Sequence, residues 1–320
     1  MPNYQGVWSL STQYQNTTGW PAPPSGTMVM AHGEDDSGKI NTISSLFIPS
    51  LGSTSDFGDL TVTRDSLTGL SSDTRGVFAG GYDNVGPARS NVMDYVTIAS
   101  AGNATDFGDF RVANNYPYAT SNITRGVIAF GYPGSYTNEV TYITIASTGN
   151  TSDFGDRTVS AYAGGATGSS TRGCFAGGDT SGGRSNVIDY VTISSTGNAT
   201  DFGDLTQGLY NFGQGNISNG TYGYFPGGRD SAAINVIQYI TIASTGNASD
   251  FGDLTAAKMN GAHSSNATRG IVAGGSTASG KILSVDYFTM STTGNAADWG
   301  DLIQKGTKGA GCSDSHGGIA

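Results

Sequence analysis

The four residues Asp-Phe-Gly-Asp occur five times in this chain, starting at residues 56, 106, 153, 201 and 250, and Asp-Trp-Gly-Asp starts at residue 298. The successive steps are 50, 47, 48, 49 and 48 residues. A period of this length is typical of supersecondary units stacked in an array, in which each unit buries its apolar face against its neighbours. The repeat therefore predicts one continuous domain.

Glycine accounts for 50 of the 320 residues, and only 12% of the residues are charged. Long helices need more Leu, Glu, Lys and Ala, so this composition favours a turn-rich β protein. Each repeat also carries a run of β-branched and aromatic residues, which buries enough apolar surface to offset the entropy of ordering. The glycine content is therefore that of an ordered array and not of a disordered chain.

The formal net charge is −10 and the isoelectric point is near 4.5. Because phosphates and anionic lipids would be repelled, we expect no nucleic-acid partner. No stretch approaches the roughly 18 to 20 apolar residues that span a bilayer, so we expect no membrane insertion. The opening MPNYQGVWSLSTQ lacks a basic region followed by an apolar one, which predicts synthesis in a cytoplasm without a signal peptide.

The repeats share four segments. The first is an apolar strand ending in glycines, at 75–81, 125–131, 172–178, 222–228 and 269–275. After a variable polar loop, the second starts at residue 91 and alternates with the period of two that indicates a strand. A Gly-Asn turn suited to a tight hairpin leads into the Asp-Phe-Gly-Asp strand, and a variable fourth segment such as 64–72 precedes the next repeat. Four short antiparallel strands per repeat predict one blade of a β-propeller.

This pattern resembles the kelch repeat, with an apolar strand closing on Gly-Gly, a Tyr in the next strand, an aromatic residue after a turn, and then an Arg. The matching residues of one repeat are Gly80, Gly81, Tyr95, Phe107 and Arg111, and Trp299 supplies the family's usual Trp in the last repeat. The resemblance covers nearly the whole chain from about residue 26 and implies a kelch-like β-propeller. Phe usually replaces Trp, Phe130 replaces one glycine, and the Arg is often absent. Propellers of the WD-repeat type are the alternative, but their Gly-His and Trp-Asp pairs do not occur.

Six Asp-Phe/Trp-Gly-Asp units predict an all-β propeller of six four-stranded blades over residues 26–320, preceded by an N-terminal segment, 1–25. An open ring would leave a strand edge exposed, so we expect the N- and C-terminal strands to close it, with 305–313 supplying the fourth segment of the first blade. Both 29–33 and 317–320 resemble a first-segment strand. A seventh blade therefore stays open as an alternative.

The acidic turns, the Asn-x-Ser/Thr sequons and the histidines are the candidates for chemistry. Paired Asp residues around a Gly can share a cation, but a turn that is the same in every repeat favours a structural role. The sequons at Asn103, Asn150, Asn198 and Asn247 have the chemistry of hairpin turns. His32, His263 and His316 occupy three different repeat positions and form no metal-ligand motif. We therefore predict no cofactor, no metal site and no enzyme activity, and interpret Cys174 and Cys312 as buried free thiols.

Tyrosine and the variable loops are the candidates for binding, because binding residues tend to lie on loops held by a rigid scaffold. The chain has 16 Tyr, whose flat amphipathic rings suit contacts with sugars or proteins. The loops between first and second strands are 82–89, 132–137, 179–184 and 229–233. The predicted binding residues are Tyr82, Asp83, Arg89, Tyr132, Tyr136, Asp179, Arg184, Arg229 and Asp230.

Phrases such as Ile-Ala-Ser-Thr-Gly-Asn-Ala-Ser-Asp-Phe-Gly-Asp resemble repetitive virion proteins of tailed bacteriophages, especially cyanophages. The resemblance implies a non-enzymatic structural protein of the virion, in contact with other virion proteins, and leaves its oligomeric state open. We expect a tail-fibre or tail-tip adhesin that binds a host surface glycan or protein. A capsid or tail decoration protein and a carbohydrate-active propeller enzyme are the alternatives. Trp8 and Trp20 in residues 1–25 are the predicted attachment residues.

Overall fold

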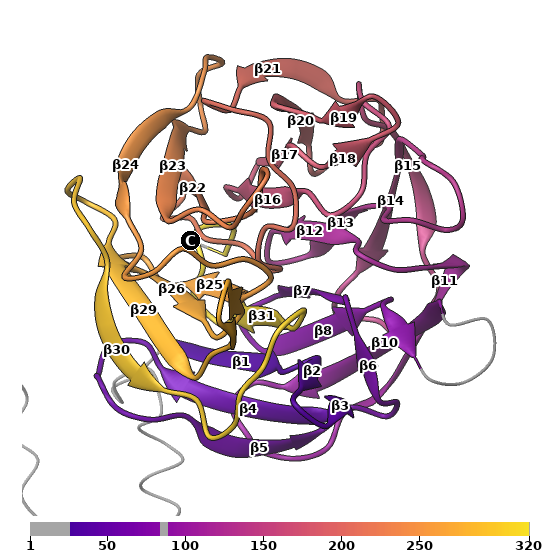
Figure 1. Cartoon of the computed structure of the whole chain (residues 1–320). Helices are drawn as coiled ribbons and strands as arrows, with labels where there is room; N and C mark the ends of the chain where they lie inside the picture. Colours follow the sequence, from indigo (N-terminus) through magenta and orange to yellow (C-terminus); the bar gives the residue numbers. More distant parts are fainter. Residues whose placement is uncertain (1–25, 84–88, 320) are drawn as a thin grey trace, which may run out of the picture.

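The computed structural model describes residues 26–83 and 89–319, and this part of the chain is all-β without a helix. Six small antiparallel sheets stand around a central axis as the blades of a propeller (Figure 1). Accordingly, the described residues include no helix that is long and apolar enough to cross a membrane. The predicted six-bladed propeller is confirmed, and the described residues contain no seventh blade.

Each blade is built outward from the axis, and its innermost strand is the fourth segment of the preceding repeat. Blade 2 consists of β7 (Thr68–Ser71), β8 (Arg75–Ala79), β10 (Ser90–Thr97) and β11 (Thr105–Asn114). Blade 3 consists of β12 (Tyr118–Ser121), β13 (Arg125–Ala129), β14 (Glu139–Thr144) and β15 (Ser152–Asp156). Blade 4 consists of β16 (Gly165–Gly168), β17 (Arg172–Ala176), β20 (Val187–Thr192) and β21 (Thr200–Asp204). Blade 6 consists of β25 (Ala262–Ser265), β26 (Arg269–Ala273), β29 (Ser284–Thr289) and β30 (Ala297–Asp301).

Blade 1 joins the two ends of the described chain. It consists of β31 (Ala310–Ser313), β1 (Thr27–Ala31), β4 (Thr42–Phe47) and β5 (Ser55–Asp59). The innermost strand β31 runs antiparallel to β1 and places Cys312 opposite Val29. The predicted closure by residues 305–313 is therefore confirmed. Residues 317–319, which resemble a first-segment strand, instead form turns near the axis, where the label C stands in Figure 1.

Blade 5 departs from the pattern at the axis. It has three regular strands, β22 (Tyr222–Pro226), β23 (Val236–Thr241) and β24 (Ser249–Asp253), and residues 214–218 take the innermost place through isolated bridges. Gln214 bridges to both blade 6 and β31, and Asn216 bridges to blade 4. A side chain at Gly213 would collide with the ring of His263, and one at Gly215 with its carbonyl oxygen. These glycines let the segment cross the axis and fill the middle of the ring.

The core lies between the blades, because each sheet is packed on both faces. The cluster between blades 1 and 2, for example, joins Ile43 and Phe57 to Phe78 and Val96. Burial on both faces explains why the inner strands read as apolar or small residues throughout, without the alternation of a half-exposed sheet. Four two-stranded elements extend from one end of the blades: β2 (Glu34–Asp35) with β3 (Gly38–Lys39), β6 (Arg64–Asp65) with β9 (Tyr82–Asp83), β18 (Asp179–Thr180) with β19 (Gly183–Arg184), and β27 (Ser276–Thr277) with β28 (Gly280–Lys281).

The most repeated segments of the sequence, the Gly-Asn turns and the Asp-Phe-Gly-Asp strands, meet at the outer rim. Gly102 N donates to Phe57 O at 2.7 Å, and Asp59 N donates to Asn103 Oδ1 at 3.1 Å, so the sequon turn of blade 2 is bonded to the Asp-Phe-Gly-Asp strand of blade 1. Further pairs of neighbouring blades repeat this contact, through Asn150, Asn198, Asn247 and Asn295. The repeated Asp, Gly and Asn residues thus join neighbouring blades, and we call this contact the latch.

Candidate ligand-binding face

The two ends of the propeller differ in what covers the axis. We call the end with the four two-stranded elements, Arg89 and residues 132–137 and 229–233 the loop face. The opposite end, which we call the serine face, carries the Gly-Asn turns and the last residues of the innermost strands. The two ends are therefore candidates for different tasks.

The serine face is closed by side chains and by the C-terminal segment. Five serines at the ends of innermost strands each donate a hydroxyl to the neighbouring strand's carbonyl at 2.5 to 2.9 Å, namely Ser71, Ser121, Ser218, Ser265 and Ser313. Gly168 takes the sixth place. His316 lies against this ring of serines, 3.3 Å from both Ser71 O and Ser121 Oγ. This end of the axis is therefore filled by structural contacts.

The loop face is organised by a closed ring of six backbone hydrogen bonds. Five of its members lie two residues before an innermost strand, and Asn211 lies three residues before the innermost segment of blade 5. Each N–H donates to the carbonyl of the member in the neighbouring blade at 2.7 to 3.2 Å. All six have a positive φ of 55° to 57° although none is glycine. The members of this backbone ring are Ser66, Tyr116, Ala163, Asn211, Asn260 and Lys308. A non-glycine residue in this region costs about 1 to 2 kcal/mol and persists only where its surroundings hold it.

Four tyrosines gather on the loop face over blades 2 to 4, and we call them the tyrosine cluster: Tyr116, Tyr132, Tyr136 and Tyr162. Tyr162 lies at the centre, with its ring centroid 5.2 Å from Tyr132, 5.7 Å from Tyr136 and 6.1 Å from Tyr116. Tyr136 donates its hydroxyl to Asp179 Oδ2 at 3.3 Å, and the guanidinium of Arg89 lies 5.2 Å from the Tyr132 ring. Burial and then the Asp179 carboxylate raise the pKa of Tyr162, so its hydroxyl stays protonated at neutral pH.

A second group of predicted residues lies on the loop face over blades 4 and 5. Arg184 Nη1 pairs with Asp230 Oδ1 at 3.1 Å across the two blades. The guanidinium groups of Arg184 and Arg229 lie 5.5 and 5.9 Å from the ring of Tyr210. The side chains of Arg184 and Asp230 are each more than a third exposed, so their ion pair stabilises the fold little. The two residues present both signs of charge to solvent.

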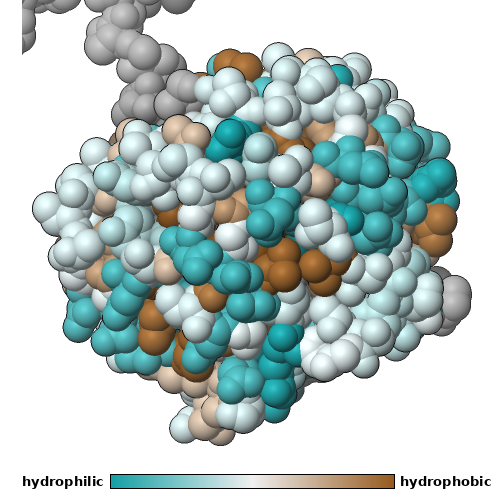
Figure 2. All heavy atoms as spheres, turned by 90° about the horizontal axis from the view of Figure 1, so that it is seen from above, coloured by the Kyte–Doolittle hydropathy of each residue, from teal (hydrophilic) through white to brown (hydrophobic). Residues whose placement is uncertain are grey.

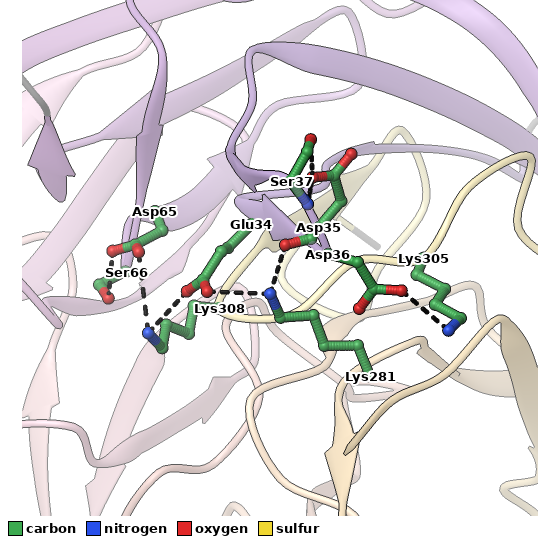
Figure 3. A network of polar contacts seen from close by, with 9 residues as sticks. All are labelled: Glu34, Asp35, Asp36, Ser37, Asp65, Ser66, Lys281, Lys305 and Lys308. Atoms are coloured by element: carbon green, nitrogen blue, oxygen red, sulfur yellow. Dashed lines mark hydrogen bonds and ion pairs between the residues drawn. The ribbon is translucent and has the colours of Figure 1, made fainter.

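A charged network joins blades 1 and 6 on the same face (Figure 3). The carboxylate of Glu34 accepts hydrogen bonds from the Nζ atoms of Lys281 at 2.9 Å and Lys308 at 2.7 Å, and Lys305 Nζ pairs with Asp36 Oδ2 at 2.9 Å. Burial alone would raise the pKa of Glu34, but the hydrogen bonds from Lys308 and Lys281 outweigh it and lower that pKa to about 2. In contrast, burial raises the pKa of Asp65, whose Oδ2 is 3.8 Å from Lys308 Nζ. The seam where the ring closes is therefore the most highly charged part of this face.

The structure places all the predicted binding residues on one face but divides them among three places. Arg89, Tyr132, Tyr136 and Asp179 meet at the tyrosine cluster, Arg184, Arg229 and Asp230 form the second group, and Tyr82 and Asp83 lie in β9 near the closing seam. Trp8 and Trp20 lie outside the described residues. The described residues contain no cluster of three or more His, Cys, Asp or Glu that could hold a metal ion.

Sequence reasoning missed the members of the backbone ring and the charged seam. Tyr116, Lys308 and Glu34 come from three different connections, and their residue types differ from those at the equivalent positions of the other repeats. The available signal was the position itself, two or three residues before the innermost segment of each blade. The rest of the surface is less distinctive. Figure 2 shows a side of the molecule on which small apolar patches are separated by polar residues.

A scan against protein-family models finds no match, and a search of the curated proteins finds none either. Among solved structures, the chain is similar to that of YjhT, with a TM-score of 0.68 and 11% sequence identity. The alignment covers 87% of this chain and 95% of YjhT. The likeness is one of fold. At this level of identity it carries over no residue roles, so the function has to be argued from the faces described above.

Proposed function

We propose that this protein is a non-enzymatic, receptor-binding adhesin of a phage particle, on a tail fibre or tail tip, and that it binds its receptor through the loop face. The placement in a particle is supported by the resemblance of the repeats to those of phage virion proteins. The binding role is supported by the tyrosine cluster, which is the observation that carries the proposal.

The tyrosine cluster suits the capture of an external partner. Tyr136 remains 37% exposed and Tyr132 is half-buried, so each ring is fixed by its neighbours yet keeps a face toward solvent. Tyrosines lose few rotamers on binding and offer both an apolar ring and a hydroxyl, which is why they are enriched in binding surfaces. Arg89 and Asp179 add a donor and an acceptor at the edge of the cluster.

The alternatives have weaker support. A decoration protein held by an N-terminal arm depends on residues 1–25, which lie outside the described residues. A carbohydrate-active enzyme requires carboxyl groups that converge, and Glu34 and Asp65 do line one pocket. Glu34, however, is engaged by two lysines and Asp65 by Lys308 and the Ser66 hydroxyl, which is the behaviour of carboxylates that hold a structure in place.

The test is the retention of fluorescently labelled protein on a panel of bacterial strains, measured by flow cytometry. We expect the double variant Tyr132→Ala/Tyr136→Ala to lower retention on a binding strain at least tenfold, since it removes half of the tyrosine cluster. Ile123→Ala is the matched control, because Ile123 is 48% exposed but lies on the serine face. Equal retention of the wild type and the double variant would contradict the proposal. So would electron microscopy of whole particles that places copies evenly over the capsid or tail tube.

A further inference from the structure

A pocket of about 490 Å3 opens on the loop face where blades 1, 2 and 3 meet. Its lining comes from the β2–β3 hairpin, from β6 and β9, and from the backbone ring, with Glu34, Lys39, Asp65, Ser66, Tyr82, Asn115, Tyr116 and Lys308 among its residues. This volume lies within the range of about 300 to 1,000 Å3 that is usual for small-molecule sites. The binding residues predicted from the sequence include only Tyr82 from this lining.

The floor of the pocket is rigid. Lys308, Ser66 and Tyr116 are three consecutive members of the backbone ring, joined by hydrogen bonds of 2.7 Å from Ser66 N to Lys308 O and 2.8 Å from Tyr116 N to Ser66 O. Each holds a left-handed backbone conformation that its side chain disfavours. The other three members of the ring share this conformation, so it belongs to the fold, and the ring of hydrogen bonds holds these side chains in place before a ligand arrives. The floor is therefore preorganised.

The charges in the pocket are balanced. Glu34 and Asp65 bring two carboxyl groups, and Lys39 and Lys308 bring two ammonium groups. Lys308 is already engaged by Glu34 Oε2 at 2.7 Å, and Glu34 also receives Lys281. An anionic ligand would thus meet Lys308 already engaged by Glu34, and Lys39 already donating to the backbone carbonyl of Asp83 at 3.2 Å. A cationic ligand would meet carboxylates already paired with lysines. The pocket favours an uncharged ligand with many hydrogen-bonding groups.

The remaining lining supplies the partners that such a ligand needs. Carboxylates accept more than one hydrogen bond, so Glu34 and Asp65 keep acceptor capacity beside their lysines. Asn115 has a buried Oδ1 with no hydrogen-bond partner among the described residues, an acceptor that is costly to leave unpaired. Tyr82 is 38% exposed at the mouth, with Lys39 Nζ 4.2 Å from its ring centroid. Its ring gives the pocket an apolar wall that the carboxyl groups do not provide.

We propose that this pocket binds one neutral pyranose unit of a glycan, with its hydroxyl groups bonded to Asp65, Glu34 and Lys308 and one face of its ring packed on Tyr82. This rests on the proposed function, because it names the chemical class of the receptor. The tyrosine cluster begins at Tyr116, which also lines the pocket, so a longer glycan continues from the pocket onto the cluster.

The experiment is saturation-transfer NMR of the full chain with single sugars: glucose, galactose, mannose and N-acetylglucosamine as neutral probes, and glucuronic acid and glucosamine as charged ones. We expect a signal from at least one neutral sugar. Tyr82→Ala should raise the Kd of that sugar at least tenfold, whereas Ile123→Ala should leave it unchanged. Both replaced side chains are exposed, so neither change is expected to unfold the protein, and circular dichroism checks this.

The outcomes separate this inference from the proposed function. No signal from any neutral sugar, a preference for a charged sugar, or an unchanged Kd in Tyr82→Ala would overturn the sugar pocket. If the wild type still adheres to cells in that case, the adhesin stands and its receptor is another molecule. If a neutral sugar binds through Tyr82 but no bacterial strain retains the protein, the pocket stands and the adhesin fails.

Discussion

At the scale of single residues, the three histidines are all buried and each is held neutral. His316 Nδ1 accepts hydrogen bonds from Asn216 Nδ2 and from Gly318 N, both at 3.1 Å, which leaves the proton on Nε2 facing Ser71 O. A second proton on Nδ1 would oppose two donors. Burial lowers the pKa of His316 to about 4, that of His32 to about 4 and that of His263 to about 3. Each value is below the ordinary 6.5.

These shifts predict acid-sensitive folding. Between pH 6.5 and about 4.5 the unfolded chain binds protons on its histidines and the folded chain does not, so the stability falls as the pH falls. Each histidine contributes a slope of about 1.4 kcal/mol per pH unit once its unfolded form is charged, and three contribute about 4. Urea unfolding at several pH values measures the slope. His316→Gln should remove about one third of this slope. A wild-type slope of about 1.4 kcal/mol per pH unit or less, the contribution of one histidine, would contradict the conclusion that all three histidines are neutral in the folded protein.

At the scale of the structural element, the outer hairpin of each blade fits only because one glycine allows close approach. Gly108 in β11 has a φ of +137°, and a Cβ there would lie 2.5 Å from Gly149 O of the next blade. Gly102, in the turn that precedes β11, has open space around it. The two glycines of one hairpin therefore differ in what they do.

Replacing these two glycines with alanine should give unequal losses. Gly108→Ala should lower the free energy of unfolding by about 1 to 3 kcal/mol, because the added methyl group presses the latch apart and the backbone conformation becomes strained. Gly102→Ala adds the same atom without a collision and should cost less than about 0.5 kcal/mol. Urea midpoints of the two variants provide the comparison. Similar losses for both would mean that the latch between blades 2 and 3 does not depend on this approach.

An Arg that lies over a Tyr ring and bonds to the next blade is missing from blade 5, where another residue makes the bond. Arg75 lies 4.2 Å from the ring of Tyr95 and donates to Ile145 O of the next blade at 2.9 Å. Blade 5 has Tyr222 in place of this Arg, and there the hydroxyl of Tyr224 donates instead to Met290 O of blade 6 at 2.5 Å. The bond to the next blade is kept although the residue that makes it has changed. Tyr222 itself packs on the ring of Tyr239.

At the scale of the whole molecule, the described residues close the ring through hydrogen bonds, packing and ion pairs. The innermost strand β31 carries Cys312, which is buried, and Cys174 is buried in β17 of blade 4. Burial raises the pKa of both thiols, that of Cys174 to about 12. Neither thiol is therefore reactive while its blade stays closed. The two cysteines report on two different parts of the ring.

We predict that alkylation in urea below the unfolding midpoint modifies Cys312 at least ten times faster than Cys174, because β31 can leave blade 1 without disturbing blade 4. Mass spectrometry of timed samples gives both rates in one experiment. Glu34→Gln weakens the charged seam and should speed the modification of Cys312 but not that of Cys174. Equal rates for the two thiols would show that the ring opens only when the whole molecule unfolds.

The features that each repeat carries by itself were predicted well from the sequence, whereas the structures that several repeats build together around the axis were not. Blade number follows from repeated segments such as Asp-Phe-Gly-Asp, and closure follows from the place of 305–313, just before a segment that resembles a first-segment strand. The pocket does not follow, because Glu34, Tyr116 and Lys308 come from different repeats and meet only when the ring closes. The crossing of the axis by 213–216 also escapes prediction, since Gly213 and Gly215 resemble ordinary loop glycines until their neighbours are in place.

The position of β31 has a consequence for biosynthesis. The strand that completes the first blade follows all the other described strands in the chain, so β1, β4 and β5 leave the ribosome long before their innermost partner exists. Blades 2 to 4 have all their strands in sequence order and can form while translation continues. Blade 1 must wait with the edge of β1 uncovered, which is when an unpaired strand is most prone to wrong pairing. A chain that stops before β31 would therefore leave its first blade without an innermost strand.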